Sequence, residues 1–171
     1  MEFQEVVKNR YSCKKYDGRQ VDQSKLDAIL EAGRLAPTAK NTQEQRVYVI
    51  RSEEALAKVD RATPCRYGAS TVLAVAYDSK EVFTYPGGRY DSGAEDATIV
   101  ATHLMLAAEN EGLATLWVGS FDPTLLRDIL PGAEAYDLVA MINVGYPAPE
   151  SQPSAMHNVR KTMAELVTRI I

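Results

Sequence analysis

A long, mostly apolar helical pattern from Gly93 to about Glu111 dominates the sequence. Its apolar residues recur at helical spacing, and Gly112 follows where a helix C-terminus favours glycine. Mostly apolar strand patterns lie on either side of it along the chain, at 71–78 and at 137–147. We therefore expect the 93–111 segment to be the core helix of a domain that also contains a sheet.

Shorter helical and strand patterns alternate along the rest of the chain. Asp22 and Asp122 stand where helix N-caps are expected, and Pro37 and Pro131 stand beyond predicted helix ends. No repeat or linker divides the sequence, so one α+β or α/β domain over 1–171 is expected. The expected elements besides the core helix are helices at 2–9, 22–36, 53–62, 122–130 and 162–171, strands at 46–51, 71–78, 113–119 and 137–147, and a loop at 79–92.

Composition and charge favour a folded protein with small partners. The chain has 171 residues, 46% of them hydrophobic and 25% charged, which is enough to bury a substantial core. Its net charge of −4 and the absence of a long basic tract argue against nucleic acid or an anionic membrane surface as a partner. No apolar run approaches the roughly 18 residues that a bilayer span needs. We expect neither a nucleic-acid nor a membrane partner.

Cysteine and histidine usage limits the available chemistry. Cys13 and Cys65 form no CxxC or metal spacing, and the start of the chain lacks the apolar stretch of a signal peptide. A reduced, cytoplasmic location is therefore expected. His103 and His157 are the only histidines, too few for the usual zinc sites and triads, so no metal site is predicted and Cys65, His103 and His157 receive no role. There is also no P-loop and no GxGxxG motif.

Basic residues gather in "NRYSCKKYDGR", residues 9–19, although the chain is acidic overall. Such a cluster is most often a solvated surface, but it can also mark an anion site. Three other polar segments stand at the ends of predicted elements: "APTAKNTQ", "WVGSFD" and "HNVRK". Each of them alone is typical of a turn or a helix terminus.

Taken in order, these segments resemble the FMN-dependent nitroreductase family. That family has a basic RxSxRK-like run, then a helix that closes in AP(S/T)xxNxQ, then a strand. Here the same order gives Arg10, Ser12, Lys14 and Lys15, followed by 36–43. The likeness extends through "VATHLMLAAENEGLATLWVGSFDP" and "INVGYPAPE" and covers nearly the whole chain. It implies a three-layer α/β/α fold of the α+β class, with a mixed sheet flanked by helices and FMN at a homodimer interface.

The resemblance also implies roles for individual residues. Arg10 and Arg160 are expected to clamp the FMN phosphate, with Ser12 donating beside them. Lys14 is expected at the N1 and O2 edge of the ring, where it tunes the flavin, and no catalytic residue is assigned because the hydride chemistry belongs to the cofactor. Lys15 has no counterpart and is expected to be a surface residue. The implied cofactor-binding set is Arg10, Tyr11, Ser12, Lys14, Pro37, Thr38, Ala39, Asn41, Gln43, Gly119, Ser120 and Arg160.

Two parts of this set are implied to act through the backbone. The segment 37–39 resembles the one that reaches the flavin from the partner subunit, with Asn41 and Gln43 as candidates for the polar edges. Gly119 and Ser120 match the place where a backbone amide approaches flavin N5 and O4. A small residue leaves room there for a planar ligand, although Gly119 taken by itself is equally a strand-end turn.

The sequence also departs from the family pattern. Tyr11 replaces a residue that is often basic, and Glu44 and Gln45 stand where proline and an aromatic residue are common. Only residues 79–92 lie where longer relatives insert helices over the substrate face. The departures indicate a minimal member of the family with an open substrate side.

The implied activity is a two-electron reduction, in which a hydride from NAD(P)H passes through flavin N5 to a small electrophile such as a nitroaromatic or a quinone. Two alternatives stay open. One is a specialised flavin enzyme of the same superfamily, such as a dehalogenase or a flavin-fragmenting enzyme. The other is a non-catalytic flavin-binding or sensor protein. The sequence predicts neither the physiological acceptor nor a preference for NADH or NADPH.

Overall fold

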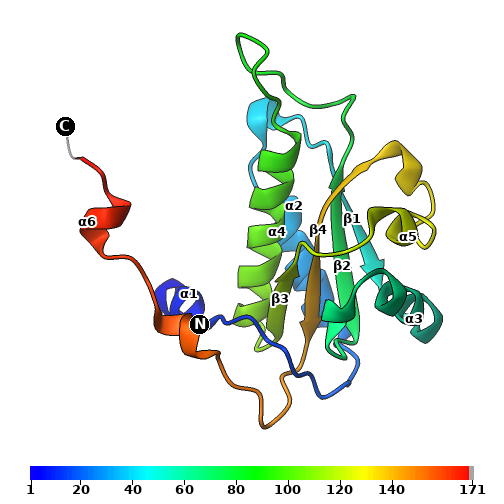
Figure 1. Ribbon diagram of the computed structural model, residues 1–171, viewed down its shortest axis with the longest axis vertical. Coiled ribbons are helices and arrows are strands. Elements are labelled where there is room, and N and C mark those ends of the chain that lie inside the picture. Colours follow the sequence, from blue (N-terminus) through cyan, green and yellow to red (C-terminus); the bar gives the residue numbers. More distant parts are fainter. Residues whose placement is uncertain (170–171) are drawn as a thin grey trace.

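The computed structural model describes residues 1–169 and contains a four-stranded sheet with helices on both faces (Figure 1). The strand order is β1-β2-β4-β3, and each neighbouring pair is antiparallel. A single parallel bridge joins Ser12 to Thr115 on β3. The strands are β1 (Gln45–Ile50), β2 (Thr71–Tyr77), β3 (Ala114–Val118) and β4 (Asp137–Gly145). The α-helices are α1 (Phe3–Asn9), α2 (Gln23–Arg34), α3 (Glu53–Ala62), α4 (Gly93–Asn110), α5 (Pro123–Arg127) and α6 (Met163–Leu166).

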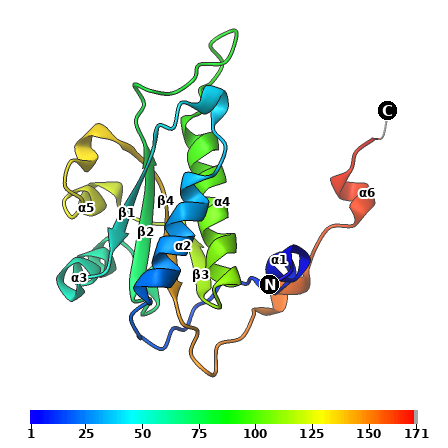
Figure 2. The ribbon, with the colours of Figure 1, turned by 180° about the vertical axis from the view of Figure 1, so that it is seen from behind.

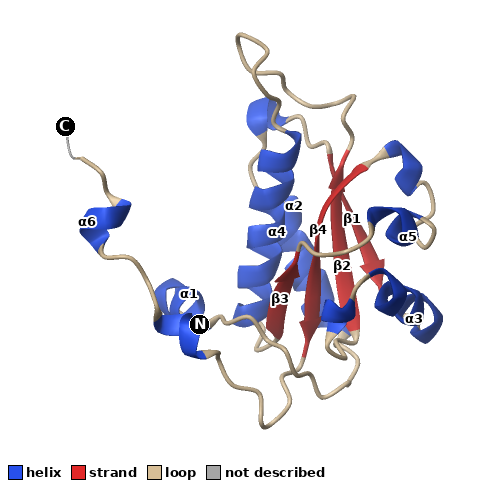
Figure 3. Cartoon of the chain, in the orientation of Figure 1, coloured by secondary structure: helices blue, strands red, loops and turns tan. Residues whose placement is uncertain are grey.

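The sheet separates two apolar layers because successive side chains of a strand point to opposite faces. On the buried strand β2, Leu73 and Val75 pack toward α2 and α4, whereas Val72 and Ala74 pack toward α3 and α5. Figure 2 shows α2 and α4 side by side on one face, and Figure 3 shows α3 and α5 on the other. The arrangement is the three-layer α/β/α fold of the α+β class that the sequence predicts.

The helix α4 is the core helix, as expected. Ala97, Val100, Ala101, Leu104 and Ala108 are all buried against the sheet and α2. A Cβ atom at Gly33 of α2 would lie 2.6 Å from the Leu104 side chain, so any other residue at position 33 would force the buried Leu104 to move. These contacts make α2 and α4 a closely packed pair.

Most predicted elements are confirmed, and three details are corrected. Asp22 precedes α2, but its carboxylate makes no capping bond and instead accepts from the Tyr146 hydroxyl at 2.8 Å. The helix α5 has only five residues, because beyond Arg127 the chain continues in i to i+3 turns, in which the Ile129 and Leu130 N–H groups donate to the Leu126 and Arg127 carbonyls at 3.1 Å. The terminal helix is reduced to the four residues of α6 within the described part, and residues 170–171 of its predicted span lie outside it. A helix this short gains little without tertiary packing.

Residues 146–169, named here the C-terminal arm, leave the sheet after β4 and extend away from the helices that cover it (Figure 1). None of the described arm residues is buried. Large apolar side chains nevertheless recur along it, with Met156 67%, Met163 70% and Leu166 73% exposed. Within residues 1–169, no helix combines the length and apolar character needed to cross a bilayer.

Candidate functional site

The extended segment from Arg10 to Lys14 runs beside β3. The Cys13 N–H donates to the Thr115 carbonyl at 2.9 Å, and Cys13 is fully buried while Ser12 and Lys14 are exposed. Because alternate residues of an extended chain point the same way, Arg10, Ser12 and Lys14 share its outer face. The local pairing therefore turns the basic sequence motif into a row of polar side chains.

Arg10 and Ser12, at the N-terminal end of this row, line a cavity of about 220 Å³ together with Arg160. The Arg10 side chain has no hydrogen-bond partner among the described residues, whereas Arg160 donates from Nη1 to the Val159 carbonyl at 2.8 Å. No carboxylate lines the cavity, so two guanidinium groups favour an anion there. The lining residues are Arg10, Tyr11, Ser12, Ser154, Met156, His157 and Arg160.

The other end of the row, Lys14, lines a second cavity of about 230 Å³. Gly119 and Ser120 form its rim directly after β3, and the Ser120 carbonyl accepts from the Thr63 hydroxyl at 2.7 Å. A Cβ atom at Gly119 would meet only Trp117 Nε1, at 3.8 Å. The packing of the chain itself therefore does not require glycine at position 119. The lining residues are Lys14, Cys65, Tyr67, Leu116, Trp117, Val118, Gly119 and Ser120.

The two cavities lie at opposite ends of the 10–14 segment and differ in charge and polarity. Arg10 and Lys14 are four residues apart, which in extended chain is about 13 Å. One cavity offers guanidinium groups, and the other offers apolar strand side chains, exposed backbone and one ammonium group. FMN has a phosphate dianion at one end and a planar ring with polar edges at the other. The residues present therefore fit this cofactor.

The predicted segment 37–43 lies elsewhere, at the first turn of α4 (Figure 1). The Ala39 N–H donates to both carboxylate oxygens of Asp96, at 3.0 and 3.1 Å. Lys40, Asn41 and Gln43 have positive φ values of 55°, 57° and 55°. The segment lines neither of the two cavities, so a single chain does not bring it together with Arg10 and Lys14.

Several lining residues were missed by sequence reasoning. His157 lies edge-on to Tyr11 with ring centroids 6.5 Å apart, and the Tyr11 hydroxyl donates to Ser151 Oγ at 2.9 Å. Burial raises the pKa of Tyr11, so its phenol is neutral. The position of His157 just before Arg160 in "HNVRK" is a signal that could have indicated it. Cys65 and Tyr67 come from a turn in which Tyr67 has a φ of 52°, and no local pattern indicates them.

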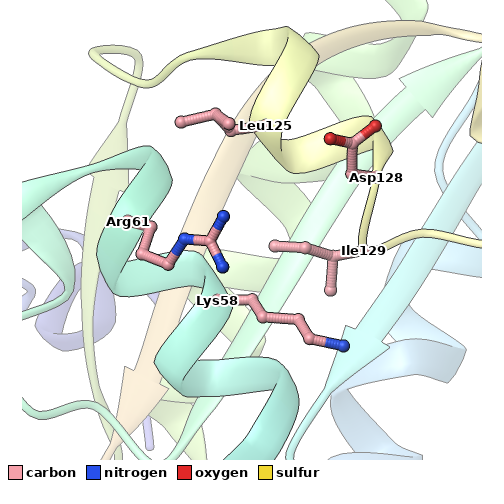
Figure 4. Close-up of a pocket in the computed structure, with 5 residues that line it drawn as sticks. All are labelled: Lys58, Arg61, Leu125, Asp128 and Ile129. Atoms are coloured by element: carbon pink, nitrogen blue, oxygen red, sulfur yellow. The ribbon is translucent and has the colours of Figure 1, made fainter.

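A further hollow of about 130 Å³ lies between α3 and α5 (Figure 4). Lys58, Arg61 and Asp128 line it together with Leu125 and Ile129, so its charges have both signs. It contains none of the predicted site residues and is a small surface hollow between two helices. Over residues 1–169, no three His, Cys, Asp or Glu side chains are grouped as metal ligands.

Relatives in two archaea are similar over most of this chain. A protein of Archaeoglobus fulgidus is 29% identical over 152 residues, 85% of each chain. One from Methanothermobacter thermautotrophicus is 28% identical over 159 residues, 86% of this chain and 78% of the other. Both are provisionally named NADH dehydrogenase/NAD(P)H nitroreductase.

Solved structures share the fold. The crystal structure of a nitroreductase family protein from Clostridium difficile superposes with a TM-score of 0.87 at 34% identity, over 98% of this chain and 97% of the other. A Desulfovibrio desulfuricans protein, provisionally named a nitroreductase and solved with FMN, has a TM-score of 0.82 at 24% identity, over 100% and 98%. The model of the Nitroreductase family matches residues 7–66 and 66–146. Because that family model matches most of its length, the chain belongs to the nitroreductase family.

Proposed function

We propose that this protein is an FMN-dependent oxidoreductase that transfers two electrons, as a hydride, from NAD(P)H to small electrophiles such as nitroaromatics or quinones. The observation that carries the proposal is the row from Arg10 to Lys14, which joins an anion-favouring cavity to a partly apolar one. The names of the archaeal relatives agree with this activity. We further propose that residues 1–171 act as one FMN-binding domain in the cytoplasm.

The phosphate end of FMN is assigned to the cavity of Arg10 and Arg160. The Arg10 side chain makes no hydrogen bond or ion pair among the described residues, although the charge of Arg10 acts on the Glu109 carboxyl. Arg160 keeps guanidinium N–H groups beyond the Nη1 that it uses on its own backbone. Ser12 adds a hydroxyl on the same face of the segment. Two guanidinium groups and a hydroxyl can hold a phosphate dianion through charge-assisted hydrogen bonds.

The ring end is assigned to the cavity of Lys14, Gly119 and Ser120. FMN, when bound, supplies the hydride chemistry of the reaction. Gly119 has no side chain, so the backbone at the end of the strand is open to a planar ligand. The space that a Cβ atom would occupy is bordered only by Trp117. Lys14 places a cation where negative charge on the ring is stabilised. The Tyr11 hydroxyl donates to Ser151 and so links the 10–14 segment to the C-terminal arm.

We propose that the active unit is a homodimer in which 37–43 of one chain meets the flavin held by the other. Two features support it. The segment is remote from both cavities of its own chain. The C-terminal arm carries exposed Met163 and Leu166, and large apolar side chains in such numbers are typical of an interface. Pro37, Thr38, Ala39, Asn41 and Gln43 would then complete the site from the partner.

A single spectroscopic experiment tests the activity. Protein reconstituted with FMN is titrated anaerobically with NADH or NADPH, and then with a nitroaromatic or a quinone. The flavin absorbance should bleach with the nucleotide and return with the acceptor. Retention of FMN without bleaching by either nucleotide would favour a flavin-binding or sensor protein. A protein that cannot be loaded with FMN would remove the flavin assignment.

A further inference from the structure

Two acidic side chains are buried together where the 37–43 segment meets α4. Glu44 is 0% exposed and Asp96 is 2% exposed. They belong to one hydrogen-bond cluster, because the Ser92 hydroxyl donates to Glu44 at 3.0 Å and the Ser92 carbonyl accepts the Asp96 N–H at 2.8 Å. Each carboxyl group also changes the pKa of the other through a side-chain hydrogen bond, and such a bond requires that one of them carries a proton. The position of Glu44 is one where the family pattern commonly has proline, so this pair belongs to the chain's own departure from that pattern.

The remaining acceptor positions of the pair are occupied by neutral donors. The Thr42 hydroxyl donates to Glu44 Oε2 at 2.6 Å, and the Ser92 hydroxyl donates to Oε1 at 3.0 Å. Asp96 accepts the Ala39 N–H on both oxygens. No ion pair among the described residues includes either acid. Two buried carboxylates in contact without a cation would be strongly unfavourable, so the pair carries a single negative charge.

The charged and titratable groups on the surrounding elements are engaged elsewhere. The Lys40 ammonium lies 5.7 Å from the Phe83 ring centroid. On the other packed elements, Arg46 forms an ion pair with Glu81, and Glu95 accepts a hydrogen bond from the Tyr85 hydroxyl. Two aspartates accept backbone hydrogen bonds, Asp78 from the Lys80 N–H and Asp91 from the Gly93 N–H. Tyr77 packs against Gly93. The charge of the pair therefore changes only when the proton shared by Glu44 and Asp96 is lost or a second proton is gained.

The segment above the pair needs external support. Three of its non-glycine residues, Lys40, Asn41 and Gln43, have left-handed φ values, a conformation that side chains disfavour. Within the segment, the Thr42 hydroxyl also contacts the Ala39 carbonyl at 2.9 Å, and Gln43 N–H donates to Thr38 Oγ1 at 3.2 Å. The bonds of Ala39 to Asp96 and of Thr42 to Glu44 anchor both ends of this strained turn to the buried pair.

We propose that Glu44 and Asp96 are positioning residues whose shared proton fixes the backbone of 37–43. The role of that segment in meeting the partner's flavin rests on the proposed function. When the proton leaves, the two carboxylates repel each other, and the turn that they anchor loses its support. The site then has a built-in sensitivity to rising pH that lies outside the cavities themselves.

The expected pH window follows from the direction of the pKa changes. Burial raises the pKa of Asp96, and the bond to Glu44 raises it further. Burial also raises the pKa of Glu44, but hydrogen bonds from Thr42 and the neighbouring groups outweigh it, so that the net change is a lowered pKa. Between the ordinary pKa of an aspartate and the raised one, the folded state binds more protons than the unfolded state, so stability falls as pH rises.

The test is amide hydrogen exchange at Ala39 in the FMN-free protein, expressed as protection relative to an unstructured peptide at the same pH. In the wild type, protection should fall by about tenfold as pH rises through the raised Asp96 pKa, because a buried hydrogen bond is lost. Glu44→Gln should keep its protection. Its amide can donate to the Asp96 carboxylate and holds no titrating proton. Asp96→Asn serves the same purpose if Glu44→Gln does not fold.

Glu95→Gln is the matched control, because it neutralises an exposed carboxylate one residue away on the same helix turn. It should retain the pH dependence of the wild type. Equal protection of the wild type and Glu44→Gln at every pH would overturn the shared proton. The FMN dissociation constant, measured across the same pH range, separates the two claims. A fall in Ala39 protection with unchanged FMN affinity would support the anchoring pair and overturn the flavin-facing role of 37–43.

Discussion

At the scale of single residues, the two arginines of the anion-favouring cavity allow a test that separates binding from folding. We expect Arg10→Ala and Arg160→Ala each to weaken FMN far more than riboflavin, which lacks the phosphate. A charge-assisted hydrogen bond contributes about 1.5 to 3 kcal/mol, so FMN affinity should fall roughly tenfold or more in each variant. Fluorescence titration of the FMN-free protein with both ligands measures the difference.

Lys15→Ala is the matched control for the two arginines. Lys15 is exposed in the same basic motif but lines neither cavity, so its removal should leave both affinities unchanged. Equal losses of FMN and riboflavin in the arginine variants would mean that the guanidinium groups support the fold instead of the phosphate.

Lys14 belongs to the other cavity and should affect the redox equilibrium of bound FMN instead of its retention. Lys14→Met keeps the length of the side chain and removes its charge. Because a cation stabilises the more negatively charged reduced cofactor, the midpoint potential should fall by about 20 to 45 mV, an amount already reduced for solvent exposure. An anaerobic titration against a reference dye measures it. An unchanged potential in fully loaded Lys14→Met would exclude Lys14 from the ring edge.

Residue identity in the motifs was easier to predict than residue pairing. Arg10, Ser12 and Arg160, which the family resemblance implied to act together, line one cavity. The contact of Glu44 with Asp96 could not be predicted, because it joins positions 52 apart and both acids have ordinary local explanations: a strand flank and the first turn of a helix. Such pairs become visible only when packing brings distant segments together.

At the scale of elements, helix capping offers a matched pair of aspartates. The Asp122 carboxylate accepts the N–H groups of Thr124 and Leu125 at the start of α5, whereas Asp22 makes no such bond at α2. Asp122→Ala should lower the free energy of unfolding by about 1 kcal/mol. Asp22→Ala removes no capping bond, and it should cost less than Asp122→Ala when both are measured in a Tyr146→Phe background, in which the bond of Asp22 to the Tyr146 hydroxyl is already absent. Urea unfolding of both variants checks the order, and the reverse order would contradict the capping assignment.

The accuracy of the predicted elements depended on whether tertiary packing decided their ends. Strands β1 and β2 and the helices α3 and α4 lie within a residue of the predicted spans, and β4 ends two residues before its predicted end. These elements were predicted well because their apolar side chains repeat with the period of the faces that they bury. The helices α5 and α6 are shorter than predicted. Beyond Arg127, Leu130 and Ala133 are buried against the sheet in a turn, so packing there favours a turn over a longer helix. Every residue of α6 is exposed in this chain, so no apolar contact extends that helix within the described residues.

At the scale of the whole molecule, a single chain leaves apolar side chains uncovered and the proposed flavin site divided between separate places, and one partner chain would complete both. The C-terminal arm carries apolar side chains without cover, and Arg160 of the first cavity belongs to that same arm. The strained segment 37–43 lines neither of the two cavities beside Arg10 and Lys14. A second copy would cover the arm, fix Arg160 and bring 37–43 to a flavin, so dimerisation and cofactor binding should be thermodynamically linked.

This linkage can be tested with one substitution in the arm. Leu166→Asp places a charge at the most exposed of its apolar side chains, 73% accessible in the single chain. The wild type should sediment as a dimer at micromolar concentration, and the variant should shift toward monomer and lose FMN in parallel, because each event needs the other. Gln152→Asp adds the same charge to the same arm at an exposed polar position and should change neither. A stable Leu166→Asp monomer that binds one equivalent of FMN would break the linkage and return the whole cofactor site to a single chain.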